Sequence, residues 1–328
     1  MAKHAAAPGL PFQVHCSANC PLSKPWSCWR MSTKVPSAAR RAITEPILTI
    51  HYGARMAEIP AHDLPVAAFD RSRLVPLQGA LNFRDVGGQP TSDGRVLRRG
   101  LVFRADNLRD LTPQDVQTVA SLGLKVVHDF RLDHERDEYP SRLPDPAPEV
   151  LLLSTGDMPE QGTSIVAMIM EMLEGTREIA PATFWEAHYA RLLDDAQPVF
   201  VALMESLAGA DRLPALFHCM GGKDRTGLAA TLLQSILGVP EELILDDLLA
   251  TNELRTMHRY AFWAPKLRAK NVDPLAALPI LGVTRSAWVH ARTHLADTYG
   301  GALGYLVAGG MEPALADVLT AKLVGDRP

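Results

Sequence analysis

HCMGGKDRTG, residues 218–227, is the stretch that decides the fold of this chain. An apolar run, residues 213–217, leads into it, and a second apolar run, residues 228–237, follows it with the spacing of a helix. This order predicts a buried strand, a tight loop and a helix start. Backbone N–H groups of such a loop form a concave anion site, and the helix N-terminus adds unpaired donors and the positive end of its dipole. The stretch therefore predicts an anion-binding loop at the end of a strand.

Cys219 and Arg225 stand six positions apart within this stretch. A positive loop of this kind favours the thiolate, which is the nucleophilic form of cysteine. The planar guanidinium of an arginine pairs two phosphate oxygens at once and stays charged. A thiolate at the centre of an anion site predicts covalent phosphoryl transfer through a cysteinyl-phosphate intermediate.

The residues between this cysteine and arginine supply the other groups that the chemistry needs. Asp224 is the nearest acid that can protonate a leaving oxygen and then activate water. Thr226 is expected to donate its hydroxyl to the cysteine sulfur, and Lys223 is expected to add positive charge at the rim. The two glycines permit backbone angles that a side chain forbids. The predicted phosphate-binding residues are Met220, Gly221, Gly222, Lys223 and Thr226.

Other classes of site share parts of this pattern. A nucleotide-binding P-loop needs GxxxxGK followed by Ser or Thr. Here Asp224 follows the lysine and Phe217 stands where the first glycine belongs, so that class is excluded. A buried cysteine is otherwise often a small hydrophobe. A phosphate-binding regulatory module without turnover and a sulfurtransferase of the rhodanese type remain as alternatives, although a rhodanese loop normally lacks the HC and GKDRTG frame.

Short apolar runs alternate with helical patterns on both sides of this stretch. Strands are predicted at 125–130, 150–153 and 213–217, and a short strand pair at 95–103 follows a turn at 92–94. A helix begins at Thr112 and Pro113 and ends before Gly123. The alternation predicts an α/β fold with a central, mostly parallel sheet flanked by helices. Further helices are predicted at 228–237, from 240, at 288–295 and at 313–323.

Residues 159–207 predict an additional helical insert in two or three pieces. Its methionine-rich part, 164–173, is typical of core packing, and the alternative is a lid over the site. A basic group follows in the next helical region. It is either a solvated helix face or a contact for an acidic peptide or a phosphoinositide headgroup, and it consists of His258, Arg259, Lys266, Arg268 and Lys270.

The decisive stretch resembles the signature HCxxGKDRTG of the atypical tyrosine phosphatases of bacteria and fungi, the tyrosine phosphatase 3 type. Four further blocks are similar to family blocks and stand in the same order, so that the resemblance covers about residues 76–255. LNFRDVGG at 81–88 resembles NFRDLGG, and RADNL at 104–108 resembles RSxxL with Ala in place of Ser. VVHDFR at 126–131 resembles a strand ending in DLR, and DLLATN at 247–252 resembles DYLLSN with Leu in place of Tyr.

The resemblance implies a cysteine-phosphatase-like fold and metal-independent hydrolysis of phosphotyrosine, with phosphoserine, phosphothreonine or phosphoinositide esters as further substrates. It implies no cofactor and no metal ion. The lysine beside Asp224 favours substrates that carry several phosphates. In this family the aspartate inside the signature is thought to be the general acid, which is Asp224 here. Asp129, at a strand end, is the alternative acid, or it orients Lys223 or a water molecule.

Asn82, Arg84 and Asp85 belong to the first of the family blocks. The resemblance implies that Asn82 and Arg84 brace the signature loop or line its rim. The alternative is a structural turn before two glycines, in which Arg84 pairs with Asp85 or with another acid.

The chain ends and the composition set the remaining expectations. Residues 1–60 are rich in Pro, Ala and Ser without sustained periodicity, which predicts a disordered extension ahead of a catalytic domain at 61–328. A net charge of −4 does not suggest a nucleic-acid partner. No apolar run reaches about 18 residues, so stable membrane insertion is not expected. A single cysteine outside the extension fits a cytoplasmic location, with export lacking a cleavable signal as the alternative. The spacing of His15, Cys16, Cys20 and Cys28 fits no common zinc pattern.

Overall fold

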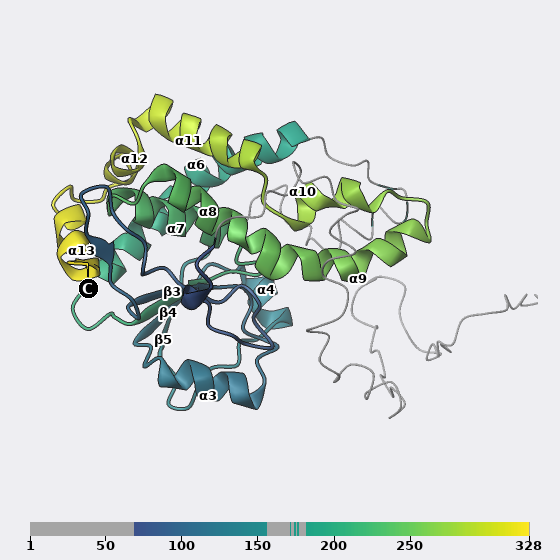
Figure 1. The fold of residues 1–328 in the computed structure, drawn as a ribbon, viewed down its shortest axis with the longest axis horizontal. Helices are drawn as coiled ribbons and strands as arrows, with labels where there is room; N and C mark the ends of the chain where they lie inside the picture. Colours follow the sequence, from purple (N-terminus) through teal and green to yellow (C-terminus); the bar gives the residue numbers. More distant parts are fainter. Residues whose placement is uncertain (1–68, 156–170, 172–173, 175, 177–181, 328) are drawn as a thin grey trace, which may run out of the picture. The chain divides into compact units, whose positions relative to one another are not determined.

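The computed structural model describes residues 69–155, 171, 174, 176 and 182–327, all within the unit Ala57–Pro328 (Figure 1). The predicted disordered extension at 1–60, with the four candidate metal ligands, lies outside the described residues. So does almost all of the methionine-rich helix predicted at 164–173, and with it the lid interpretation of that segment.

A five-stranded sheet lies at the centre of the fold, in the order β1-β3-β6-β4-β5. β3, β6, β4 and β5 are parallel, and β1 alone in this sheet is antiparallel, pairing with β3. The prediction of a central, mostly parallel sheet flanked by helices is therefore confirmed. The strands are β1 (Arg84–Asp85), β3 (Val102–Ala105), β4 (Val126–Asp129), β5 (Glu149–Leu152) and β6 (Ala215–His218).

Helices cover both faces of this sheet (Figure 1). Val126 and Phe217 point to one face and belong to the larger apolar cluster, together with α6 (Ala182–Ala208), α7 (Arg225–Ile236) and α8 (Glu241–Thr251). Their neighbours Val127 and Leu216 point to the other face and pack in a second cluster with α3 (Pro113–Ser121). Successive strand residues alternate between faces, so strands buried on both sides need the continuous apolar runs seen in the sequence.

Local sequence signals set several helix ends as predicted. Thr112 caps α3 in a reciprocal capping box with Asp115, and Gly123 follows the helix with a φ of 62°. The other helical segments are η2 (Arg71–Arg73), α4 (Asp133–Glu138), the π-helix η3 (Asn252–Thr256), α9 (Met257–Arg268), η4 (Pro274–Ala277), α10 (Leu278–Leu281), α11 (Arg285–Tyr299), α12 (Ala302–Ala308) and α13 (Leu315–Leu323).

The strand pair predicted within residues 95–103 is wrong. β2 (Val96–Leu97) pairs with β7 (Val324–Gly325) near the C-terminus, in a separate two-stranded sheet. β3 is bonded on both edges by β1 and β6, so it has no edge left for β2. Gly100, with a φ of 75°, turns the chain between β2 and β3.

From residue 182 onward the predicted insert is one long helix, α6, which continues through Pro198. Leu193, Phe200 and Leu207 on this helix are completely buried in the larger apolar cluster. This part of the insert is therefore core. The N-terminal part of α6 also carries side chains that reach the loop after β6, as described next.

Candidate active site

The loop at 219–224 leaves the carboxyl edge of the sheet, between β6 and α7. Ala105, Asp129 and His218 are register partners at the ends of β3, β4 and β6. Cys219 follows His218 directly and is 2% exposed. The structure thus contains the predicted strand, loop and helix, and it brings the ends of three parallel strands to one place, where α/β folds bind ligands.

The loop is held by donors that bind its carbonyl groups. Gly222 O accepts from Asn82 Nδ2 at 2.9 Å and from Arg104 Nη2 at 3.0 Å, and Gly221 O lies 3.4 Å from the same Asn82 nitrogen. A trans peptide unit directs its C=O and N–H in opposite directions. The Gly222 N–H, which follows the Gly221 carbonyl, accordingly points the other way and donates to Cys219 Sγ at 3.2 Å.

Gly222 also sets how closely the loop approaches β3. Its φ is 60°, and a Cβ at this position would lie 2.6 Å from the carbonyl oxygen of Ala105. Met220 O accepts from the Asn107 N–H at 3.2 Å, which fixes the loop to the same segment. Gly221 has room for a side chain, since its nearest neighbours would lie 3.6 Å or more away. Only the second glycine of the pair is required by the backbone.

A buried ionic cluster centred on Asp247 supports the loop from behind. Asp247 is 1% exposed and pairs with Arg73 at 2.7 Å, Arg84 at 3.2 Å and Arg104 at 2.6 Å. Burial, reinforced by Arg104, lowers the pKa of Arg84 to about 9, which leaves it charged at neutral pH. The three arginines hold the pKa of Asp247 well below its usual range despite burial. The cluster therefore carries an excess of positive charge next to an anion-binding loop.

The structure contains features of both interpretations of the first family block. Asn82 contacts the loop carbonyls, and its Oδ1 accepts from Arg84 Nη1 at 2.6 Å. Arg84 pairs with Asp247, which is the "other acid" of the alternative, and not with Asp85. Asp85 instead accepts from two backbone N–H groups, those of Gly87 and Gly100, at 2.7 Å each. Asn82 and Arg84 brace the loop, whereas Asp85 shapes a separate turn.

Arg225, the first residue of α7, is fixed by Glu135 of α4. Its two terminal nitrogens each lie 2.8 Å from a carboxylate oxygen of Glu135, and Nη1 also donates to Phe130 O at 3.0 Å. Burial acts to lower the pKa of Arg225, but its hydrogen bonds to Glu135 and the nearby Cys219 raise this pKa overall. A bidentate pair of this kind presets the orientation of the guanidinium.

Asp224 receives two donors on the same oxygen. Its Oδ1 accepts from the Tyr189 hydroxyl at 2.9 Å and lies 3.1 Å from Lys223 Nζ. Burial acts to raise the pKa of Asp224, but the Lys223 ammonium and these hydrogen bonds outweigh it and hold this pKa below its usual value. Oδ2 has no hydrogen bond within the part of the chain that the structure describes, and Asp224 is partly exposed. The carboxylate is thus fixed through one oxygen and open through the other.

Lys223 does not lie at the rim, contrary to the expectation from the sequence. Its side chain is 1% exposed, and its Nζ donates to Gly282 O at 3.0 Å. The ammonium also lies 4.8 Å from the centre of the Trp185 ring on α6. The Lys223 ammonium therefore acts mainly on Asp224, and its contacts are with the protein itself and not with a ligand at the rim.

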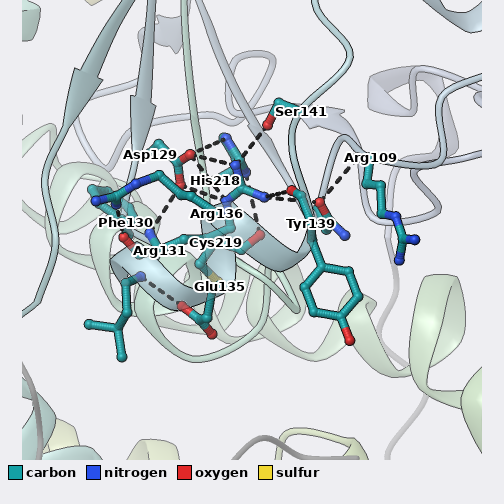
Figure 2. A network of polar contacts seen from close by, with 12 residues as sticks. Arg109, Asp129, Phe130, Arg131, Glu135, Arg136, Tyr139, Ser141, His218 and Cys219 are labelled. Carbon is teal, nitrogen blue, oxygen red and sulfur yellow. Dashed lines mark hydrogen bonds and ion pairs between the residues drawn. The ribbon is translucent and has the colours of Figure 1, made fainter. Parts of the chain in front are cut away.

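Asp129 forms a buried ion pair with Arg131 (Figure 2). Both carboxylate oxygens accept from the Arg131 side chain, at 2.6 to 3.1 Å, and Oδ1 also accepts from the Arg131 N–H. His218 Nε2 lies 3.7 Å away. Burial acts to raise the pKa of Asp129, but Arg131 and His218 lower it overall. Asp129 contacts neither Lys223 nor Asp224, so the structure does not bring this predicted residue to the loop.

Thr226 is completely buried, and its Oγ1 has no hydrogen-bond partner among residues 69–155 and 182–327. The predicted hydrogen bond from Thr226 to Cys219 is therefore absent in this structure. The Gly222 N–H donates to the cysteine sulfur instead.

Four residues of the site were not singled out in the sequence as contacts of the loop. Arg104 and Asp247 lie in the similar blocks, and Glu135 follows the block at 126–131, so the signal that could have found them is an unassigned charge in or next to each block. Tyr189 lies in the predicted insert and carries no sequence signal, since its partner is 35 residues away along the chain.

The described residues contain no group of three or more His, Cys, Asp or Glu side chains placed to hold a metal ion. Among the described helices, none is both long enough and apolar enough to cross a membrane.

Known proteins similar to this chain share most of its length. Residues 75–325 match the model of the tyrosine phosphatase family. A protein of Cupriavidus necator is 27% identical over 248 residues, which cover 74% of this chain and 86% of its own length. The triple specificity protein phosphatase PtpB of Mycobacterium tuberculosis is 27% identical over 286 residues, covering 76% and 98%. A tyrosine-protein phosphatase of Nostoc commune is 28% identical over 236 residues, covering 67% and 73%.

Proposed function

The chain belongs to the tyrosine phosphatase family and is a phosphatase, and on that premise we propose that it hydrolyses phosphotyrosine through a cysteinyl-phosphate formed on Cys219. The observation that carries the proposal is the loop itself. A cysteine sulfur receives a loop N–H, an arginine is preset by a bidentate carboxylate, and an aspartate is held with one oxygen free.

In the first step the Cys219 thiolate attacks phosphorus, the S–P bond forms and the P–O bond to the substrate breaks. The loop N–H groups and the Arg225 guanidinium neutralise the equatorial oxygens. Asp224 gives its proton, carried on Oδ2, to the leaving oxygen. The resting carboxylate is ionised, and a bound phosphate dianion nearby raises its pKa towards the range that this step needs.

In the second step the ionised Asp224 removes a proton from water, the water oxygen attacks phosphorus and the S–P bond breaks. Inorganic phosphate and the Cys219 thiolate are the products, so atoms and charges balance without a metal ion or cofactor. Asp224 is preferred to Asp129 as the acid because Asp129 is saturated by Arg131. Glu135 is a positioning residue that acts through Arg225.

The test is hydrolysis of a generic aryl phosphate in reducing buffer that contains a chelator. We expect turnover by the parent protein and none by Cys219→Ser, with the fold retained. Phosphate binding without turnover would support the regulatory-module alternative, and thiosulfate turnover without phosphatase activity would support the rhodanese type. Continued turnover by Cys219→Ser would exclude the cysteinyl-phosphate.

Asp224→Asn tests the acid separately. An aryl leaving group needs less protonation than an alkyl one, so we expect a larger loss on alkyl phosphates. Equal losses on both classes would mean that Asp224 is not the leaving-group acid.

Phosphoprotein is the substrate class that we favour, since phosphotyrosine is the group common to the family. The mycobacterial relative is named a triple specificity protein phosphatase, which supports a substrate panel broader than phosphotyrosine. We include phosphoserine and phosphothreonine peptides and inositol lipids in that panel. We also propose a cytoplasmic location, where a catalytic thiolate stays reduced.

A further inference from the structure

Two arginines near the loop, Arg255 and Arg259, lie on the segment after α8. Arg255, in the π-helix η3, lies beside Gly221, because a Cβ on Gly221 would be 3.7 Å from the guanidinium carbon of Arg255. Its Nε lies 3.5 Å from Asp106 Oδ2. Within the described residues the guanidinium makes no other polar contact, so the donors of its two terminal nitrogens are not used.

The segment that carries Arg255 is rigidly placed. Asn252 exchanges two hydrogen bonds with the backbone of Val283, at 2.8 Å each. The π-helix adds one residue to the turn and so changes the direction of the side chains that follow, a device common at functional sites. Arg255 is therefore held beside the loop, with only 11% of its side chain exposed.

Arg259 lies one helical turn further along α9. It is half-buried, and its Nε is inaccessible to solvent without a hydrogen-bond partner among the described residues. Burial, and then the charge of Arg255, lowers the pKa of Arg259. Two like charges four residues apart on a helix repel each other. Asp106 and Asp110 offset part of this charge. The Nε of Arg259 is still without a hydrogen-bond partner among the described residues.

We propose that Arg255 and Arg259 form a second anion-binding site beside the phosphate loop, which binds acidic side chains flanking the phosphotyrosine of a protein substrate. The inference rests on the proposed function, since it assigns the substrate class of the same site. The two arginines take the role that the sequence suggested for Lys223. The Lys223 side chain is buried, and its ammonium already donates to Gly282 O.

The spacing of the two arginines favours a peptide. Residues four apart on a helix are separated by about 6 Å along its axis. Alternate residues of an extended chain are separated by about 6.6 Å and point to the same side. Two acidic side chains at alternate positions after the phosphotyrosine therefore match the two guanidinium groups, one at the loop and one further out.

The experiment compares two phosphotyrosine peptides that differ only at the flanking positions, with Asp in one and Asn in the other. We expect the parent protein to favour the acidic peptide in kcat/KM by at least about tenfold, since hydrogen bonds to charged groups are the stronger class. Raising the salt concentration should reduce this preference, which needs no variant. Arg259→Gln should reduce it as well.

Lys266→Gln is the matched control. Lys266 lies on the same helix, and its ammonium already lies 3.4 Å from the centre of the Phe262 ring, so we expect this variant to keep the preference. Arg259→Glu, assayed with a peptide that carries Lys at the flanking positions, should invert the preference and so excludes simple loss of fold.

Equal kcat/KM for the two peptides, with normal turnover of an aryl phosphate, would overturn the second site and leave the proposed function intact. No turnover of either peptide or of the aryl phosphate would overturn the proposed function. Faster turnover of a phosphoinositide in mixed vesicles, lost in Arg259→Gln, would assign the arginines to a membrane surface instead of a peptide.

Discussion

Gly222→Ala should damage the site through the backbone alone. At a φ of 60° an alanine is in the left-handed region, which is unfavourable by about 1–2 kcal/mol. The added Cβ would also lie 2.6 Å from the Ala105 carbonyl oxygen and 2.7 Å from the Asp106 nitrogen. Both are main-chain atoms that cannot rotate away. We therefore expect the free energy of unfolding to fall by about 1–3 kcal/mol in total.

The loss of activity should exceed the loss of stability. Relief of the clash moves Gly222 away from β3, and this residue carries both the carbonyl that binds Asn82 and Arg104 and the N–H that binds Cys219. A displacement of about 1 Å in a catalytic group can reduce the rate about 100-fold. We expect a fall of that size in kcat/KM for an aryl phosphate, in protein that is still folded.

Gly221→Ala is the matched control, since the nearest atoms to its Cβ would be those of Lys223 and Arg255 at 3.6–3.7 Å, an ordinary contact distance. Urea unfolding and steady-state kinetics of both variants form the assay. Gly221→Ala should change the free energy of unfolding by less than about 0.5 kcal/mol. Equal effects of the two substitutions would refute the claim that the close approach to β3 sets the loop geometry.

Three further perturbations test separate parts of the structure. Asp247→Asn leaves three arginines without their carboxylate. The free energy of unfolding, measured in urea, should fall by about 3–5 kcal/mol. A loss below about 1 kcal/mol would contradict the claim that Asp247 neutralises three buried arginines. Tyr189→Phe removes a donor that lowers the pKa of Asp224. The basic limb of the rate–pH profile should therefore move to higher pH, and kcat should fall about tenfold. Tyr305→Phe is the control, since it loses a buried hydrogen bond to α6 away from the loop and should leave the profile unchanged. Burial lowers the pKa of His128 from 6.5 to about 4, so its contribution to stability is complete above pH 6.5 and declines as the pH falls towards 4. The free energy of unfolding in urea should therefore fall by about 2 kcal/mol more between pH 7 and pH 5 in the parent than in His128→Gln. Equal changes in the two proteins would exclude His128 as the origin.

The sequence predicted best what neighbouring residues determine together. The strand, loop and helix around Cys219 follow from an apolar run, two glycines and a second apolar run, all within 25 residues. The start of α3 follows from Thr112 and Asp115, which cap it reciprocally. Signals of this kind depend on contacts three or four residues apart, so they can be recognised before the fold is known.

Pairings across the chain were predicted less well, because a sequence displays charges without showing which of them meet. Arg84 and Asp85 are adjacent and opposite in charge, yet they do not pair. Both lie on β1, and neighbouring strand residues point to opposite faces, so Arg84 meets Asp247 while Asp85 binds backbone N–H groups. The same limit applies to Glu135 with Arg225 and to Tyr189 with Asp224, which come from separate elements.

The buried arginines are best explained by the loop that they hold. Replacing a buried ion cluster with apolar residues of similar volume is often neutral or stabilising, so stability alone does not account for three arginines around Asp247. Arg104, however, divides its donors between Asp247 and Gly222 O. An apolar substitute would release that carbonyl, and the peptide units of the loop could then turn their N–H groups away from the sulfur. The orientation of the loop amides, which depends on the cluster, therefore explains the buried arginines better than folding stability does.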